Sequence, residues 1–248
     1  MKFKSSHSSF ALFFFAILFS SGKIFSQDAD MNDAFYSKAL QNSMAFYHQS
    51  FGSQSALYNG PTYNGYLFRF KEGHPYFFAE AMTIGSVTYD GIRYDSVLMQ
   101  YDEIADILVV RNPEGKIRLW DQKVTSFHLY NSEFVLLEKD SGLMNAGNPR
   151  FYNQLYKGKI TLLKKEIKII REEISSANEL LRFADQKDHY YIIKDGHWTQ
   201  VNSRKDFYKI LGEKGRDVKQ FVKTNKLSFR QDRQNMLTRA TAYYDSLK

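Results

Sequence analysis

The sequence predicts an α+β fold with an N-terminal helix, an antiparallel β-meander and a C-terminal cap of short helices. Residues 76–137 contain short apolar and aromatic runs that each end at a turn signal, which is typical of strands joined by hairpins. Residues 203–248 instead carry apolar residues three and four positions apart, which is typical of amphipathic helices. We expect the strands to form a curved sheet or a small barrel-like body.

Residues 1–26 have the composition of a Sec-type signal peptide. Lys2 and Lys4 precede an apolar run over residues 10–19, which is shorter than the roughly 20 residues that a membrane-spanning helix needs. No later segment is apolar enough to span a membrane either. The expected divisions are a signal peptide over 1–26, a β-rich body with the N-terminal helix over 27–202, and a helical cap over 203–248.

We expect the signal peptide to be cleaved after Ser26, with cleavage near Gly22 as the alternative. The chain contains no cysteine, which excludes a lipoprotein anchor, disulfides and thiolate metal sites. The sequence therefore predicts a periplasmic or secreted protein whose fold depends on its core alone.

The charge is unevenly distributed along the chain. Without Lys2, Lys4 and Lys23 of the predicted leader, 31 basic residues remain against 27 acidic ones. Residues 27–150 contain 10 basic and 15 acidic residues, whereas residues 151–248 contain 21 basic and 12 acidic ones. An exported protein rarely meets nucleic acid, so we expect none as a partner. Acidic lipid headgroups, lipopolysaccharide or the acidic half of the protein itself are better candidates for the basic half.

The N-terminal helix is predicted over residues 32–51. Because this segment lacks a basic face, packing on the sheet is favoured over contact with a membrane surface or a partner. The apolar residues of its predicted face are Tyr36, Leu40, Met44, Tyr47 and Phe51.

Residues 53–66 are rich in turn-forming residues and tyrosine, and a short strand is predicted next, over residues 67–70. Tyr58, Tyr63 and Tyr66 are the candidate binding residues, because together they could form an aromatic platform for a ligand. The alternative is that these tyrosines attach the loop to the body.

The meander is predicted to have five or six strands. Asp90-Gly91 is the strongest hairpin signal, because a primed turn needs positive φ at both central positions. The apolar residues then change phase, from even positions before Asp95 to odd positions after Ser96. A slip by one residue would reverse the two faces of the strand, so we expect a bulge or bend at Asp95-Ser96.

Residues 159–174 fit both a helical stripe and strand alternation, and a strand is favoured only as far as Leu163. Whether residues 164–174 form a helix or a strand stays open. Residues 175–188 are polar and are expected to form a loop. A hairpin with its turn at Asp195-Gly196 is predicted to follow.

Three short helices are predicted from residue 203 onward. Ser203 with Asp206 indicates an N-terminal cap, residues 212–215 are expected to break the first helix, and Ser228 can cap the third.

Two stretches resemble uncharacterised secreted β-rich proteins of the Bacteroidota. The first is Gly85-Ser86-Val87-Thr88-Tyr89-Asp90-Gly91 with its continuation to Tyr101-Asp102, and the second is the ending, with Tyr190-Tyr191-Ile192, Asp195-Gly196, Phe221 to Leu227 and Tyr243-Tyr244. The resemblance implies an exported β-rich protein with a helical tail. It implies no activity and no catalytic residue.

The sequence contains no recognisable catalytic motif. The acidic residues of the meander lack the spacing of a calcium loop or a glycosidase pair and fit turns better, and no two of the six histidines are three or four positions apart. We therefore expect no metal and no cofactor. A Ser/His/Asp triad assembled from distant segments stays open. The acidic residues in question are Asp90, Asp95, Asp102 and Asp106.

The leading hypothesis is a non-enzymatic binding or structural module of the cell envelope. Its partner would be an envelope component or another protein. The alternative is a hydrolase of an unrecognised type that acts on a cell-surface polymer.

Overall fold

The computed structural model describes residues 38–39, 56–137 and 150–247. The chain divides into two compact units, residues 1–40 and 41–248. All strands and helices discussed below belong to the second unit. The predicted signal peptide and almost all of the predicted N-terminal helix lie outside the described residues.

The described part of the second unit contains ten strands, three α-helices and three short 3₁₀ turns. The strands are β1 (Thr83–Tyr89), β2 (Ile92–Asp102), β3 (Ile107–Asn112), β4 (Gly115–Arg118), β5 (Val124–Leu129), β6 (Ser132–Leu137), β7 (Arg150–Lys157), β8 (Ile160–Ile174), β9 (Leu180–Lys194) and β10 (His197–Gln200). The helical elements are η2 (Ala56–Tyr58), η3 (Asp121–Lys123), α2 (Arg204–Leu211), η4 (Gly212–Lys214), α3 (Gly215–Thr224) and α4 (Arg233–Ser246).

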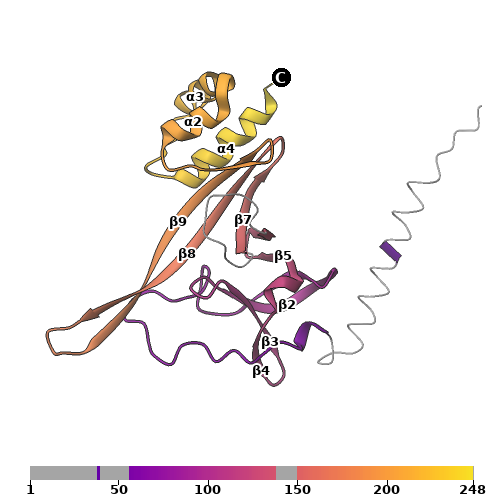
Figure 1. Ribbon diagram of the computed structural model, residues 1–248, viewed down its shortest axis with the longest axis vertical. Coiled ribbons are helices and arrows are strands. Elements are labelled where there is room, and N and C mark those ends of the chain that lie inside the picture. The colour runs from indigo at the N-terminus through magenta and orange to yellow at the C-terminus, as the bar shows by residue number, and fades with distance from the viewer. Residues whose placement is uncertain (1–37, 40–55, 138–149, 248) are drawn as a thin grey trace, which may run out of the picture. The chain divides into compact units, whose positions relative to one another are not determined.

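The predicted α+β class is wrong, because the fold is predominantly β. All ten strands join one antiparallel sheet in the order β10-β9-β8-β7-β6-β5-β1-β2-β3-β4 (Figure 1). After the sheet come a helical stretch over residues 204–224 and the shorter helix α4. None of the helices in the described part of the chain has the length and apolarity to cross a bilayer.

The β1–β2 hairpin follows the local signals in the sequence. Asp90 and Gly91 have φ values of 54° and 77°, so the primed turn predicted at this position is confirmed. The register shifts between Gly85 and Val87, which pair with Val97 and Tyr94. This shift leaves two residues of β2 opposite one of β1, so the bulge predicted at positions 95 and 96 is confirmed as well.

The prediction of a simple meander is wrong at one connection, the one between β4 and β5. β5 does not pair with β4 but returns to β1, where Ser86 pairs with His128 and Tyr89 pairs with Val124. The connection passes through η3, and Leu119 before it and Val124 after it are both almost fully buried. Burial of these apolar side chains in the core is favourable, and it directs the chain back to β1.

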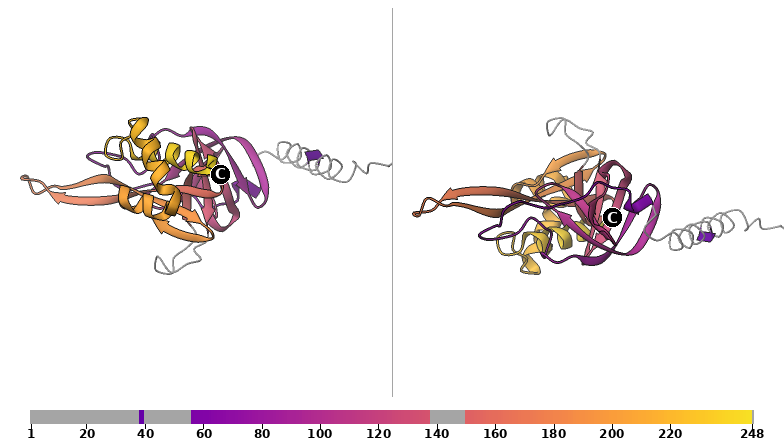
Figure 2. Two further views of the ribbon diagram at one scale, coloured as in Figure 1. Left: turned by 90° about the horizontal axis from the view of Figure 1, so that it is seen from above. Right: turned by 90° about the horizontal axis from the view of Figure 1, so that it is seen from below.

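β8 and β9 form a long hairpin whose strands pair in unbroken register from Ile160↔Lys194 to Ile174↔Leu180. Residues 164–174 are therefore a strand, and the loop predicted over 175–188 is wrong beyond residue 179. Polar residues suit this hairpin because they pair across it: Arg171 lies 2.6 Å from Asp185, in a row with further ion pairs. In both views of Figure 2 the distal end of the hairpin extends beyond the helices.

The strand predicted over residues 67–70 is also wrong. Residues 59–82 are irregular, and their bridges to the sheet are isolated ones, at Thr62, Glu72 and Tyr76.

The helices pack on β8 and β9 and share one hydrophobic cluster with them. Ile192 of β9 lies in this cluster with Phe207 of α2 and Leu237 of α4, and all three are fully buried. Ser203 caps α2 as predicted, because its side chain accepts the Asp206 N–H at 3.1 Å. The break predicted at residues 212–215 is present, since Gly212 ends α2 with a φ of 64°, but η4 joins α2 directly to α3 with no loop between them.

Candidate functional site

Two of the three predicted binding tyrosines meet on one buried carboxylate, that of Asp102. The Tyr63 hydroxyl donates to it at 2.7 Å and the Tyr66 hydroxyl donates to it at 3.1 Å. Asp102 also accepts the backbone N–H groups of Ile104 at 2.9 Å and Ala105 at 3.0 Å. These contacts join the irregular segment before β1 to the turn between β2 and β3.

Burial raises the pKa of Tyr63 and of Tyr66 far above the ordinary tyrosine range, and the negative charge of Asp102 raises both further. Both side chains therefore remain neutral hydrogen-bond donors. Tyr58 is not brought to this place, because it packs against the core formed by β1–β6. The ring of Tyr66 lies 5.6 Å from the ring of Phe68. A ligand-binding role for these three tyrosines stays a prediction.

β8 carries a buried group of lysines, two of which contact the turn that follows Asp102. Lys164, Lys165 and Lys168 are only 6%, 3% and 7% exposed. Buried lysines need partners, because an unpaired ammonium group in the protein interior is strongly destabilising.

Lys165 has a partner for each donor of its ammonium group. Its Nζ lies 2.7 Å from Asp106 Oδ1, 3.1 Å from the Tyr101 hydroxyl and 2.8 Å from the carbonyl oxygen of Phe151. These partners belong to β2, to the turn after it and to β7, so one side chain joins three parts of the body to β8.

Lys168 joins β8 to the same turn from the other face of the strand. Its Nζ lies 3.0 Å from Glu103 Oε2 and also donates to the carbonyl oxygen of Tyr76. Burial raises the pKa of Glu103 to about 7; the negative charge of Glu166 adds to this shift and the positive charge of Lys168 opposes it. Lys164, the third lysine, pairs with Glu166 and lies 3.0 Å from Asp188.

The group formed by these three lysines and their acidic partners is an internal support for the hairpin. Lys165 and Lys168 hold β8 against the body, whereas Lys164 pairs within the hairpin, with Glu166 of β8 and Asp188 of β9. In residues 56–137 and 150–247 no group of three or more His, Asp or Glu side chains is placed to hold a metal ion. This group was not predicted from the sequence, although Lys164-Lys165-Glu166 directly after the apolar Leu162-Leu163 could have indicated buried ion pairs.

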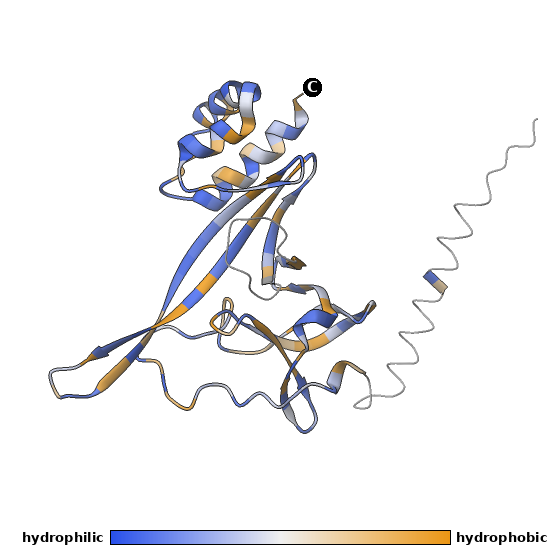
Figure 3. Cartoon of the chain, in the orientation of Figure 1, coloured by the Kyte–Doolittle hydropathy of each residue, from blue (hydrophilic) through white to orange (hydrophobic). Residues whose placement is uncertain are grey.

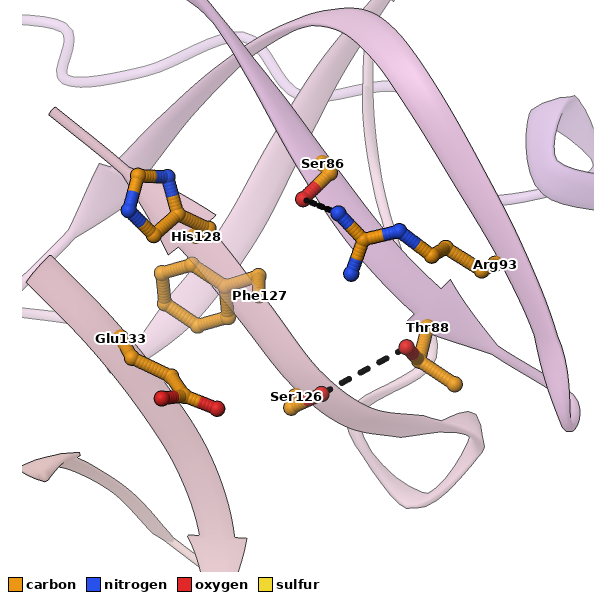
Figure 4. A pocket seen from close by; sticks show the side chains of 7 residues that line it. All are labelled: Ser86, Thr88, Arg93, Ser126, Phe127, His128 and Glu133. Carbon is orange, nitrogen blue, oxygen red and sulfur yellow. Dashed lines mark hydrogen bonds between the residues drawn. The ribbon is translucent and has the colours of Figure 1, made fainter.

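A polar pocket of about 250 Å³ lies on β1, β2, β5 and β6 (Figure 4). Ser86, His128 and Glu133 form a row across three strands, with Ser86 paired to His128 and His128 paired to Glu133. The Arg93 guanidinium donates to the Ser86 hydroxyl at 3.0 Å. The residues that line the pocket are Ser86, Thr88, Arg93, Ser126, Phe127, His128 and Glu133.

This row has the residue types of a hydrolytic triad but not its hydrogen bonds. Among the described residues, no hydrogen bond connects His128 to Ser86 or to Glu133, and the Ser86 hydroxyl is already bonded to Arg93. A nucleophilic serine needs a base within hydrogen-bond reach. The pocket is therefore a hydrogen-bonding surface and does not have the geometry of an activated nucleophile.

The helical stretch exposes a row of cations, which we call the cationic face. Arg216, Lys219 and Lys223 lie three and four residues apart on α3, and all three are exposed. Val218 and Val222, on the opposite side of the helix, are buried in the cluster shared with the sheet. Further exposed cations of the helical region are Arg204, Lys205, Lys209, Lys226, Arg230 and Arg239.

The cationic face is not neutralised from within the described chain. All ion pairs between described residues fall within residues 90–188, so none involves the helices. α3 contains a single acidic residue, Asp217. The face therefore carries a net positive charge that is open to an external partner.

No protein-family model, no curated protein and no solved structure matches this chain.

Proposed function

We propose that this protein is an exported, non-enzymatic binding protein of the cell envelope, and that the cationic face binds the phosphate groups of anionic lipid headgroups. The leader-like composition of residues 1–26 and the resemblance to secreted β-rich proteins support export. The hydrolase alternative has less support, because the row of Ser86, His128 and Glu133 lacks the hydrogen bonds of a triad.

The observation that carries the proposal is the exposed, unpaired row of Arg216, Lys219 and Lys223 on α3. A basic side chain near an anionic bilayer surface contributes about 1 kcal/mol of attraction. A row along one helix face lets several cations approach a flat surface together. The apolar side of α3 is already used in the core, so the attraction would be electrostatic and sensitive to salt.

Reversing the three charges tests this role. The variant Arg216→Glu/Lys219→Glu/Lys223→Glu should bind vesicles that contain phosphatidylglycerol at least about 100-fold more weakly, because about 3 kcal/mol of attraction is lost and the new carboxylates are repelled. The measurement is co-sedimentation with vesicles at low and at high salt, with pure phosphatidylcholine vesicles as the neutral surface.

The matched control reverses three exposed cations elsewhere, in Arg111→Glu/Lys157→Glu/Lys187→Glu. It changes the net charge by the same amount and should retain most of the binding. Equal losses in the two variants, or equal binding of the wild type to both kinds of vesicle, would contradict the assignment to α3.

The predicted export to the periplasm can be tested separately. Expressed with residues 1–26 in a Gram-negative host, the protein should be recovered from the periplasmic fraction with Gln27 or a near neighbour as its first residue. N-terminal mass spectrometry of the fractions measures this directly. Recovery of the uncleaved chain from the cytoplasm alone would rule out export, whatever the vesicles show.

A further inference from the structure

β8 has a free backbone edge at the distal end of the hairpin. β7 pairs with β8 only from Thr161 to Lys164. Further along, the Lys168 N–H donates to the carbonyl oxygen of Glu103 at 3.5 Å. Beyond that contact no residue in the described ranges pairs with this edge as far as Ile174, where the strand ends (Figure 1).

The contact of Lys168 fixes which backbone groups face this edge. Successive residues of an antiparallel strand direct their N–H and C=O groups to opposite edges. Because Lys168 faces away from β9, the residues two, four and six positions later do so too. The free edge therefore presents the backbone groups of Ile170, Glu172 and Ile174.

The edge of β9 that faces away from β8 supports this assignment independently. The carbonyl oxygen of Arg182 accepts the Lys71 N–H at 2.7 Å, and the Ala184 N–H donates to the carbonyl of Glu72 at 3.0 Å. Arg182 and Ala184 therefore face away from β8. Their partners across the hairpin are residues 172 and 170, which must face away from β9.

The free edge also carries exposed apolar side chains. Ile170 is 37% exposed, Ile174 is 75% exposed, and Leu180, the partner of Ile174 across the hairpin, is 48% exposed. Figure 3 shows hydrophobic segments in this distal part of the hairpin. An unpaired edge with apolar side chains is a template for another strand.

We propose that two copies of this chain pair antiparallel along this edge, related by a two-fold axis at Glu172. The free stretch runs from Ile170 to Ile174, and Glu172 is its middle residue. A two-fold axis through the middle uses every free backbone group, and each residue pair can exchange both of its hydrogen bonds.

In this register the side chains of one copy are complementary to those of the other copy. Ile170 of one copy lies opposite Ile174 of the other, so the exposed apolar residues are buried together. On the other face Arg171 lies opposite Glu173, which places opposite charges side by side. Glu172 of one copy lies opposite Glu172 of the other. Each of these carboxylates is already paired within its own copy, with Arg182 at 2.7 Å.

Registers displaced toward the body can be excluded on the same grounds. With the axis at Arg171 or at Ile170, Lys168 would have to pair with Ile174 or Glu172 of the second copy. The Lys168 N–H is already used by Glu103, and the turn that carries Glu103 occupies that edge. The body of the protein therefore limits pairing to the distal stretch.

A single cysteine tests the register, because the chain has none of its own. Paired residues on a two-fold axis have Cα atoms about 5.5 Å apart, which suits a disulfide. Under mild oxidation the full-length Glu172→Cys protein should form a covalent dimer. In Ile174→Cys the two thiols lie four residues out of register, roughly 13 Å apart, and should cross-link roughly tenfold more slowly or not at all.

A second variant separates pairing from folding. Glu172→Pro removes a backbone N–H that faces the free edge and leaves the pairing with β9 intact. It should be monomeric by analytical ultracentrifugation at concentrations at which the wild type dimerises, with an unchanged circular dichroism spectrum. A wild type that stays monomeric while Glu172→Cys fails to cross-link, or equal cross-linking of Glu172→Cys and Ile174→Cys, would overturn the proposal.

Discussion

Replacing Lys165 with methionine is expected to lower the free energy of unfolding by about 3 to 5 kcal/mol, the usual loss when one member of a buried ion pair is removed. Methionine keeps most of the volume but removes the ammonium group that lies 2.7 Å from the buried Asp106 carboxylate. The Tyr101 hydroxyl and the carbonyl of Phe151 lose a donor at the same time. Urea denaturation at pH 7, followed by circular dichroism, measures the change.

Two further variants assign that loss to the buried pair. Lys187→Met removes an exposed lysine from β9 and should change the free energy of unfolding by less than about 0.5 kcal/mol. Lys165→Met/Asp106→Asn removes both charges of this pair and should recover part of the loss, which a double-mutant cycle reports as a coupling energy. Additive effects of the two substitutions would show that this pair does not stabilise the body.

The free energy of unfolding is also expected to fall as the pH rises toward 7, because of Glu103. This side chain is only 1% exposed, and burial, with a smaller contribution from Glu166, raises its pKa to about 7 in spite of Lys168. A carboxyl with a raised pKa binds its proton more tightly in the folded chain. Its stabilising contribution is complete below about pH 4.5 and is lost as the pH rises through about 7, a change of about 3 kcal/mol for this group.

Glu103→Gln isolates this contribution, because the amide mimics the protonated carboxyl at every pH. Urea denaturation between pH 5 and pH 8 should show a smaller decline for Glu103→Gln than for the wild type. Glu114→Gln, at an exposed turn position, should decline as the wild type does. If Glu103→Gln keeps the full decline, another group is responsible for it.

The candidate sites were predicted only in part. Tyr63 and Tyr66 were singled out from their positions beside turns, and they do lie together. Their common partner Asp102, 39 residues from Tyr63, had been assigned to a turn. The cationic face of α3 follows from the charge of the second half of the chain, but the burial of Val218 behind it required the structure.

The sequence by itself determined the local features of this protein. The turns at Asp90-Gly91 and Asp195-Gly196 have positive φ, and the cap at Ser203 forms as expected. Each depends on the conformation of a few neighbouring residues, so its signal lies within those residues.

Only the tertiary structure decided which strands pair and how long β8 is. Lys165 meets Asp106 across 59 positions of sequence, and Lys168 meets Tyr76 across 92. A lysine-rich segment with both helical and strand periodicity is ambiguous on its own. Its first part, residues 164–168, becomes a buried strand because distant carboxylates pair with Lys165 and Lys168 and distant carbonyl oxygens accept their hydrogen bonds. The free energy of those contacts exists only once the chain has folded.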